Sequence, residues 1–221
     1  MKIYILTLAS TVESYDITVK RLIEAGFNES QLVKHLGIHG VKEPKLLAYA
    51  ALKWNCSKDP YPAQQGCSFA HLDAMEKFLV TDDEYCMIIE NDLLLPSNFM
   101  DMFQDVMKEA SNYDILFIGW EDLLMYRPKR SEPKLIPYHP LCMHCYVVSR
   151  VGARKICETI KKNGLTTILD VWIANRAEEL GIISLCVNPH SYNFTIPLTA
   201  RMNRANGIAF QDGAIPSTID I

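Results

Sequence analysis

Short apolar runs of strand length alternate along this chain with amphipathic segments of helical periodicity, and this alternation limits the possible folds. Residues 2–8, 85–89 and 114–120 are largely apolar runs, which are typical of strands covered on both faces. Apolar residues at spacings of three and four predict helices between such runs. Strands that alternate with helices predict an α/β fold, with a mainly parallel sheet flanked by helices in a single domain.

Capping and turn residues suggest where the elements begin and end. Ser10 and Glu13 form a capping-box pattern that predicts the start of the first helix, and Gly26 predicts its end. Ser97 is the expected N-cap of a later helix, and Gly164 is the expected end of another. The remaining expected elements are helices over residues 69–79, 150–162 and 169–180, and strands over 146–149 and 182–187.

Three stretches lack a clear pattern. Residues 30–60 are weakly patterned, with a turn at 58–60. Residues 121–140 contain four prolines, which predicts a long surface loop. An irregular tail is expected from about residue 188, within a single domain that covers residues 1–221.

Composition excludes several classes of protein. The 221 residues carry a net charge of -4, which argues against binding nucleic acid by bulk electrostatics. No apolar run approaches the length of a transmembrane segment, and the opening run is too short for the core of a signal peptide. Seven scattered cysteines are typical of reduced thiols, so a cytoplasmic location is expected.

An acidic segment follows the second of the apolar runs. Glu90, Asn91 and Asp92 stand where that strand is expected to end. In open α/β sheets ligands bind beyond the carboxyl ends of the strands, and Mg²⁺ or Mn²⁺ takes one or two protein carboxylates together with substrate phosphates. On an extended chain Glu90 and Asp92 point to one side and Asn91 to the other. The segment predicts a metal-bridged diphosphate, although acids at strand ends also serve solubility alone.

Several motifs, taken in order, resemble those of glycosyltransferase family 25. They are QGCSFAH (65–71), MIIENDLLLP (87–96), DILFIGW (114–120), CMHCYVVSRVGARKI (142–156) and LDVWI (169–173). The family, which includes lipopolysaccharide and collagen galactosyltransferases, has G-C-x-x-S-H, an apolar run ending in E-D-D, D-I-x-x-L-G, and a later D-V. The resemblance covers about half of the chain. It implies a GT-A fold of Rossmann-like type, a nucleotide-sugar donor and a divalent metal.

The resemblance assigns roles near the acidic segment. Asp92 is the expected ligand of Mn²⁺ or Mg²⁺, with a surface acid as the alternative. Glu90 is expected to accept hydrogen bonds from the donor, and His71 matches the family histidine; structural roles in the interior are the alternatives for both. The expected donor-binding residues also include those at the end of the first strand and the middle residue of the acidic segment: Thr7, Leu8, Ala9 and Asn91. Here the family pattern N-L-x-R reads Thr7-Leu8-Ala9-Ser10, without its arginine.

Two later residues complete the expected catalytic and metal sites. Asp170 matches the family aspartate and is expected to be the general base that deprotonates the acceptor hydroxyl. The alternative is a helix N-cap, for which aspartate is favoured. His190 is an expected late metal ligand, with an ordinary loop histidine as the alternative.

A tryptophan, a cysteine- and histidine-containing segment and a basic cluster could each have either a functional or an ordinary structural role. Trp120 could stack on an acceptor sugar or pack in the core. Cys142, His144 and Cys145 lack the spacing of a zinc finger, so core and loop roles are expected. The basic cluster Arg127-Pro-Lys129-Arg130 could steer an anionic substrate or form a solvated loop.

The expected function is metal-dependent transfer of a hexose from a UDP-sugar to a sugar or a lipid-linked glycan acceptor. An inverting single displacement with one base is the expected mechanism. A nucleotidyltransferase is the first alternative, but residues 7–14 (TLASTVES) lack a Gly-rich loop with a lysine or arginine to bind a triphosphate. A non-catalytic nucleotide-sugar-binding relative is the second, since Asn91 replaces an aspartate. The sequence leaves the sugar, the acceptor, the stereochemistry of transfer (inverting or retaining) and the oligomeric state open.

Overall fold

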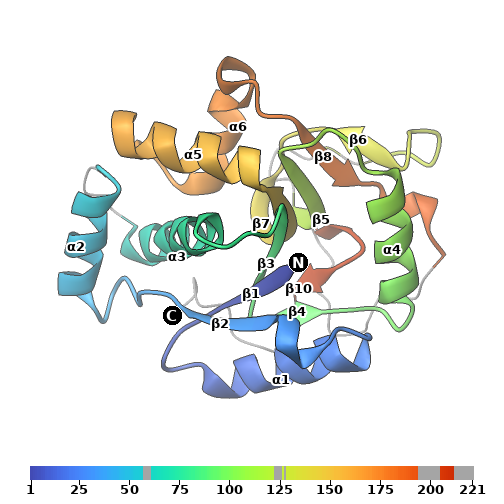
Figure 1. The fold of residues 1–221 in the computed structure, drawn as a ribbon, viewed down its shortest axis with the longest axis horizontal. Helices are drawn as coiled ribbons and strands as arrows, with labels where there is room; N and C mark the ends of the chain where they lie inside the picture. Colours follow the sequence, from blue (N-terminus) through green and yellow to red (C-terminus); the bar gives the residue numbers. More distant parts are fainter. Residues whose placement is uncertain (57–60, 122–125, 127, 194–204, 212–221) are drawn as a thin grey trace.

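The computed structural model describes residues 1–56, 61–121, 126, 128–193 and 205–211. Its centre is an eight-stranded sheet in the order β2-β1-β3-β7-β5-β8-β6, with β9 paired to β5 (Figure 1). The strands are β1 (Lys2–Thr7), β2 (Leu32–Leu36), β3 (Tyr85–Glu90), β5 (Ile115–Glu121), β6 (Leu135–Pro137), β7 (Leu141–Ser149), β8 (Ser184–Val187) and β9 (Ala205–Gly207). A second, two-stranded sheet pairs β4 (Leu93–Leu94) with β10 (Phe210–Gln211).

The central sheet is mixed, and most of its strands run in one direction. β1 pairs in parallel with β2 and β3, and β5 pairs in parallel with β8. β7 lies antiparallel between β3 and β5, so these two strands point the same way. β6 and β9 run against their neighbours. The prediction of an α/β fold with a mainly parallel sheet is confirmed.

Helices cover both faces of the sheet (Figure 1). They are α1 (Val12–Glu24), α2 (Pro44–Lys53), α3 (Pro62–Leu79), α4 (Phe99–Glu109), α5 (Arg150–Asn163) and α6 (Leu169–Leu180), with short 3-10 turns η1 (Glu29–Gln31) and η2 (Pro189–Ser191). On one face α1 and α4 pack over Ile3, Ile5 and Met87 of the strands. On the other, α2, α3, α5 and α6 belong to the core that includes Ile88 and Tyr146. Successive strand residues therefore feed opposite cores.

The predicted helices are largely correct, but two predicted N-caps are wrong. α6 has the predicted bounds, and α5 ends at Asn163 with Gly164 as its C-cap, where the φ of 88° suits a glycine. The N-cap of α1 is Thr11 rather than Ser10, and that of α4 is Asn98 rather than Ser97; neither side chain makes a capping bond. The Thr11 hydroxyl is engaged elsewhere, because it accepts hydrogen bonds from the amide of Leu8 and from a distant side chain.

Elements are also present where no pattern predicts them. β2 and α2 lie in the weakly patterned stretch 30–60. The predicted surface loop over residues 121–140 is wrong for residues 135–137, which form β6, and β7 begins at Leu141, before the predicted strand 146–149. The expected irregular tail from about residue 188 is wrong for residues 205–211, where β9 pairs with β5 and β10 with β4. These strands are two or three residues long and depend on pairing with distant strands. The predicted turn at 58–60 and Arg127 lie outside the described residues.

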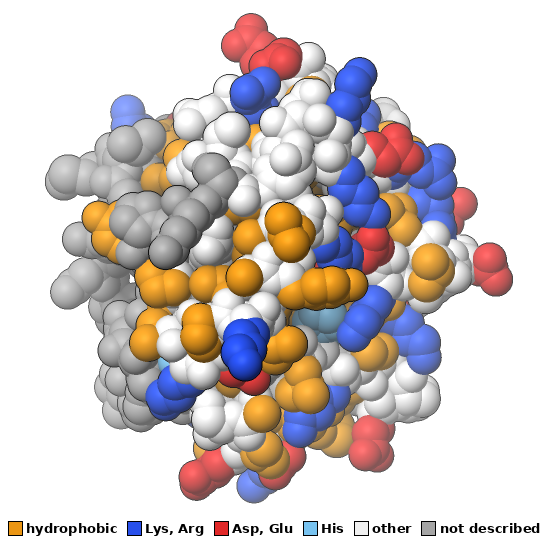
Figure 2. All heavy atoms as spheres, turned by 90° about the vertical axis from the view of Figure 1, so that its left-hand side faces the viewer, with side chains coloured by type: hydrophobic (Ala, Val, Ile, Leu, Met, Phe, Trp, Pro, Cys, Tyr) orange, Lys and Arg blue, Asp and Glu red, His pale blue; other side chains and the backbone are white. Residues whose placement is uncertain are grey.

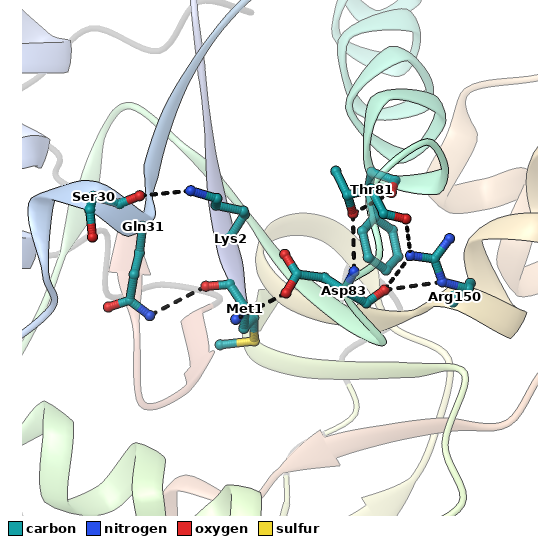
Figure 3. A network of polar contacts seen from close by, with 8 residues as sticks. Met1, Lys2, Ser30, Gln31, Thr81, Asp83 and Arg150 are labelled. Atoms are coloured by element: carbon teal, nitrogen blue, oxygen red, sulfur yellow. Dashed lines mark hydrogen bonds and ion pairs between the residues drawn. The ribbon is translucent and has the colours of Figure 1, made fainter.

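A network of polar contacts closes the end of the sheet where β1 and β3 begin (Figure 3). The guanidinium group of Arg150 donates to the backbone carbonyls of Leu79, Thr81 and Asp83 at 2.5–3.1 Å. The carboxylate of Asp83 pairs with the amino group of Met1 at 3.4 Å. Lys2 donates to the carbonyl of Ser30, and Gln31 to that of Met1. We call these contacts the amino-end network.

The outer surface of α2 is apolar. Leu46, Tyr49 and Leu52 are 52%, 72% and 83% exposed, whereas Leu47 and Ala50 face the core. Figure 2, which views the molecule from the side where α2 lies, shows hydrophobic side chains interspersed with lysine and arginine. No helix within the described residues is long and apolar enough to cross a membrane. The cytoplasmic location stays a prediction.

Candidate functional site

A pocket lies at the carboxyl ends of β1 and β3, which are neighbours in the sheet with Leu6 opposite Glu90. It is lined by the end of β1, the loop after β2, the start of α3 and the end of β3: Leu6, Thr7, Leu8, Gly37, Ile38, His39, Gly40, Ala63, Gly66, Cys67, Glu90 and Asn91. Four residues expected to bind the donor, namely Thr7, Leu8, Glu90 and Asn91, therefore line one pocket. Ala9 and His71 are not among the lining residues.

Glycine lets the first turns of α3 approach the loop after β2. A Cβ atom on Gly66 would lie 2.5 Å from the carbonyl oxygen of Ile38, and one on Gly40 would lie 1.7 Å from that of Pro62. Neither contact is sterically possible, so a side chain at either position would push the helix and the loop apart. The two glycines therefore set the width of the pocket.

The carboxylate of Glu90 faces α3. His71 and Cys67 lie one turn apart on that helix, so both side chains reach the same place. His71 Nε2 is 3.5 Å from Glu90 Oε1, and Cys67 Sγ is 3.7 Å from the same oxygen. Gln211 Nε2 donates to Glu90 Oε2 at 2.9 Å. Burial acts to raise the pKa of Glu90, but its contacts with His71 and Gln211 lower it overall, which favours the carboxylate.

His71 has a buried partner on its other side. Its Nδ1 atom is 3.0 Å from the hydroxyl of Tyr146 on β7, and both residues are almost fully buried. His71 is therefore held between Glu90 of β3 and Tyr146 of β7, behind the pocket wall. Within the part of the chain that the structure describes, the ligand atoms of Cys67, His71 and Glu90 form one group, with all three within 4.8 Å of one another. We call it the Cys67–His71–Glu90 cluster.

Asn91 points toward α1. Its Nδ2 atom donates to the hydroxyls of Thr7 at 3.0 Å and Thr11 at 2.9 Å. Its backbone carbonyl accepts a hydrogen bond from Thr18 at 2.7 Å. Glu90 and Asn91 thus have partners on different helices, in agreement with their expected opposite orientations. The amide of Asn91 fixes the ends of β1 and β3 to the start of α1.

The charges of three acids act on the thiol of Cys67. Asp92 is 4% exposed in the turn between β3 and β4. The pKa of Cys67 is well above its ordinary value because of burial, and then because of the nearby charges of Glu90, Asp170 and Asp92. Glu90 is the acid that contacts this thiol and lines the pocket, whereas Asp92 and Asp170 act on the thiol through their charges.

Asp170 is the second residue of α6, and the N-cap is Ile168. Its Oδ2 accepts from the amide of Cys142 at 2.9 Å, and its Oδ1 from the amide of Val171 at 2.7 Å. The N-cap alternative is thus wrong in position. The carboxylate still makes a structural contact through the amide of Cys142. Cys142 has a φ of 60°, which is unusual for a residue other than glycine, and this hydrogen bond helps to hold it there.

The remaining candidates have ordinary surroundings. His190 is exposed on η2 and does not belong to the Cys67–His71–Glu90 cluster. Trp120 is fully buried, donates to the carbonyl of Val187 at 3.2 Å and stacks on Tyr126, so it packs in the core. His144 and Cys145 are buried, as expected for core roles. Lys129 and Arg130 are exposed in the loop before β6.

Sequence reasoning misses the partners of Glu90. Cys67 stands in a quoted motif, and its spacing of four from His71 on a helix could have revealed a shared face. Tyr146 and Gln211 offer no such signal, because each reaches the site from a distant strand.

The fold is similar to those of several solved glycosyltransferases. No curated protein sequence matches the chain significantly. Mouse xyloside xylosyltransferase 1 is similar in structure, at 10% identity over 85% of this chain and 84% of that chain, with a TM-score of 0.44. A mutant Drosophila β-1,4-galactosyltransferase 7 in complex with manganese, UDP-Gal and xylobiose is also similar in structure. It is 12% identical over 94% of this chain and 70% of that chain, with a TM-score of 0.44. The galactosyltransferase LgtC in complex with donor and acceptor sugar analogues is 11% identical over 79% of this chain and 70% of that chain, with a TM-score of 0.46.

A sequence match covers the centre of the chain. The sequence model described as "Glycosyltransferase family 25 (LPS biosynthesis protein)" matches residues 62–172. The matched region runs from the first residue of α3 into the first turn of α6. It therefore contains the Cys67–His71–Glu90 cluster, Asp92 and Asp170.

Proposed function

The chain belongs to glycosyltransferase family 25, and we propose that it transfers a hexose from a UDP-sugar to a hydroxyl group of a sugar or lipid-linked glycan. The observation that supports this most is the position of Glu90 in a pocket at the ends of β1 and β3, with the buried carboxylate of Asp92 two residues further along the chain. Carboxylates beyond the ends of parallel strands suit a donor that carries a metal-bound diphosphate.

The residues present fit a hard divalent cation. Asp92 supplies carboxylate oxygens in the turn that directly follows the pocket residue Asn91, and oxygen ligands are those that Mn²⁺ and Mg²⁺ prefer. We therefore propose Asp92 as the ligand from this chain. His190 stays a predicted further ligand, on the exposed turn η2. When bound, the metal would neutralise charge that develops on the leaving diphosphate.

The pocket residues would hold the donor. We propose that Thr7, Leu8, Ala9 and Asn91 position the nucleotide at the end of β1, with Glu90 facing it from β3. The Asn91 amide keeps the Thr7 hydroxyl in place, so this side of the pocket is formed before the donor arrives. His71 acts through Glu90, since its own ring lies behind that carboxylate.

Asp170 would take the proton of the acceptor. Two backbone amides hold its carboxylate in one orientation. Each carboxylate oxygen has more than one lone pair, so an acceptor hydroxyl can still donate to Asp170. In the proposed inverting displacement, the acceptor oxygen forms a bond to the anomeric carbon while the bond from that carbon to the diphosphate oxygen breaks. The hydroxyl proton passes to Asp170.

The position of Asn91 is compatible with a catalytic protein. In the resembled pattern an aspartate stands here, but the side chain of Asn91 points toward Thr7 and Thr11, away from the Cys67–His71–Glu90 cluster. Replacing that aspartate therefore removes no carboxylate from the side of the strand that Glu90 occupies. This supports a catalytic role over simple binding.

A thermal-shift measurement tests the proposal. UDP should raise the melting temperature with Mn²⁺ or Mg²⁺ and much less with EDTA, because a ligand that binds only the folded state stabilises it by mass action. Equal shifts with and without the chelator would remove the metal from the proposed mechanism. Release of free hexose from a UDP-sugar in the presence of metal would separate catalysis from binding, and release of pyrophosphate would instead indicate a nucleotidyltransferase.

A further inference from the structure

The Cys67–His71–Glu90 cluster has the composition of a site for a softer metal. It combines a thiol, an imidazole and a carboxylate, which are the three ligand types that Zn²⁺ takes in proteins. The hard cation at Asp92 prefers oxygen ligands alone. We propose that this cluster is a separate binding site for Zn²⁺ or a similar transition-metal ion. The proposal does not rest on the glycosyltransferase activity.

The distances agree with tetrahedral geometry. Zinc bonds of about 2.3 Å to sulfur and about 2.1 Å to nitrogen and oxygen give ligand separations of about 3.6 Å for S···O and about 3.4 Å for N···O. The observed separations are 3.7 Å from Cys67 Sγ to Glu90 Oε1 and 3.5 Å from His71 Nε2 to the same oxygen. The sulfur–oxygen and nitrogen–oxygen separations therefore need to change little for these three atoms to bind one ion.

Outer partners already orient two of the ligands. Tyr146 lies at 3.0 Å from His71 Nδ1, which leaves Nε2 directed toward the cluster. Gln211 donates to Oε2 of Glu90, which leaves Oε1 for the ion. Metal sites commonly hold their histidine and carboxylate ligands through such outer hydrogen bonds.

The pocket provides access and a fourth position. Cys67 and Glu90 both line it, whereas His71 is 3% exposed. An ion held by these three side chains would have its open position on the pocket side, where water or a bound ligand could complete the tetrahedron. Such an ion would also tie the end of β3 to α3.

Cobalt serves as the probe, because Co²⁺ bound to a thiolate absorbs in the near ultraviolet. Adding Co²⁺ to the chelator-treated full chain should produce this absorption at one equivalent, and Zn²⁺ should displace it. Cys67→Ser should lose the band, while Cys56→Ser, which removes another partly buried thiol, should keep it. Asp92→Asn should also keep it, so loss of UDP binding and loss of this site are distinguishable.

The buried Tyr146 provides a milder test. Tyr146→Phe removes only the hydroxyl that contacts His71 and should weaken Co²⁺ affinity by about 10- to 100-fold. No thiolate band in the parent protein, or a band that persists in Cys67→Ser, would overturn the proposal. If Cys67→Ser fails to fold, alkylation of the parent decides: Zn²⁺ should protect Cys67 but not Cys56 from iodoacetamide, and equal labelling with and without Zn²⁺ would also overturn it.

Discussion

The two ends of the central sheet use polar side chains in different ways. Where β1 and β3 begin, the amino-end network directs charged groups at the backbone: Arg150 alone donates to three carbonyl groups. Where the same strands end, Glu90 and Asp170 accept from amide groups, and Glu90 also faces an imidazole and a thiol. One end joins elements of the fold, and the other gathers carboxylates beside a pocket.

Structural and functional polar groups can be separated by what they contact. A cation that contacts carbonyl oxygens of several segments replaces their hydration and stabilises the fold. Carboxylates that gather beside a pocket gain from a ligand that brings positive charge. Variants at the amino end should therefore change the free energy of unfolding, and variants at the pocket end should change binding or turnover.

The largest effect is expected at Asp92. Asp92→Asn should abolish metal-dependent UDP binding, because a neutral amide is a poorer ligand for a hard cation. Asn91→Asp should keep the affinity within a few-fold of the parent, since the Thr7 and Thr11 hydroxyls can donate to a carboxylate there. Calorimetry with UDP at fixed Mn²⁺ measures both. The reverse ranking would assign the metal to the other side of this segment.

Asp170 comes next. Asp170→Asn should keep UDP binding and lower kcat by about a hundredfold or more, because an amide cannot take the acceptor's proton. One amide oxygen can still accept from Cys142, so the fold should survive. Steady-state transfer and UDP titration on the same preparation check this. Normal kcat in the folded fraction, together with a lowered melting temperature, would make Asp170 a structural residue only.

At the opposite end of the sheet, Arg150→Gln should lower the free energy of unfolding by about 2 to 3 kcal/mol, because carbonyl groups lose a charged donor. The UDP affinity should not change. Arg154→Gln is the matched control on the same helix, since its pair with Glu158 is exposed and should contribute well under about 1 kcal/mol. Urea unfolding measures both variants. An Arg150 variant with normal stability and weakened UDP binding would contradict the assignment of the amino-end network to stability alone.

The smallest effect tests a structural contact within the pocket end. Asn91→Ala should lower the free energy of unfolding by about 1 kcal/mol, because the Thr7 and Thr11 hydroxyls lose one partner but keep the carbonyl of Leu8. Urea denaturation checks the value. A large loss of turnover with unchanged stability would show that Asn91 acts on the donor and not by holding Thr7 and Thr11 in place.

Sequence reasoning places the elements that carry their own periodic pattern. α6 has the predicted bounds, and β3 ends one residue beyond the predicted strand. The location of the pocket also follows, because Glu90 comes directly after an apolar run of strand length. Local pattern suffices in these cases because long, regular elements are stabilised by burying one periodic face.

Local pattern does not show how distant segments meet. β9 and β10 are too short to have a period, and they exist through pairing with β5 and β4. The same holds for the contact between Gln211 and Glu90, which joins residues 121 positions apart. At Thr11, a contact with Asn91 competes with capping, and no rule for a single helix end includes that competition.

The long separation between Glu90 and Gln211 has a consequence for synthesis. A ribosome releases the chain from its amino end, so β3 and α3 can pair long before Gln211 emerges. Until then Glu90 lacks its amide donor, and β4 has no β10 to pair with. The nascent protein can therefore assemble most of its core before the Glu90 carboxylate gains this donor and β4 gains its partner strand.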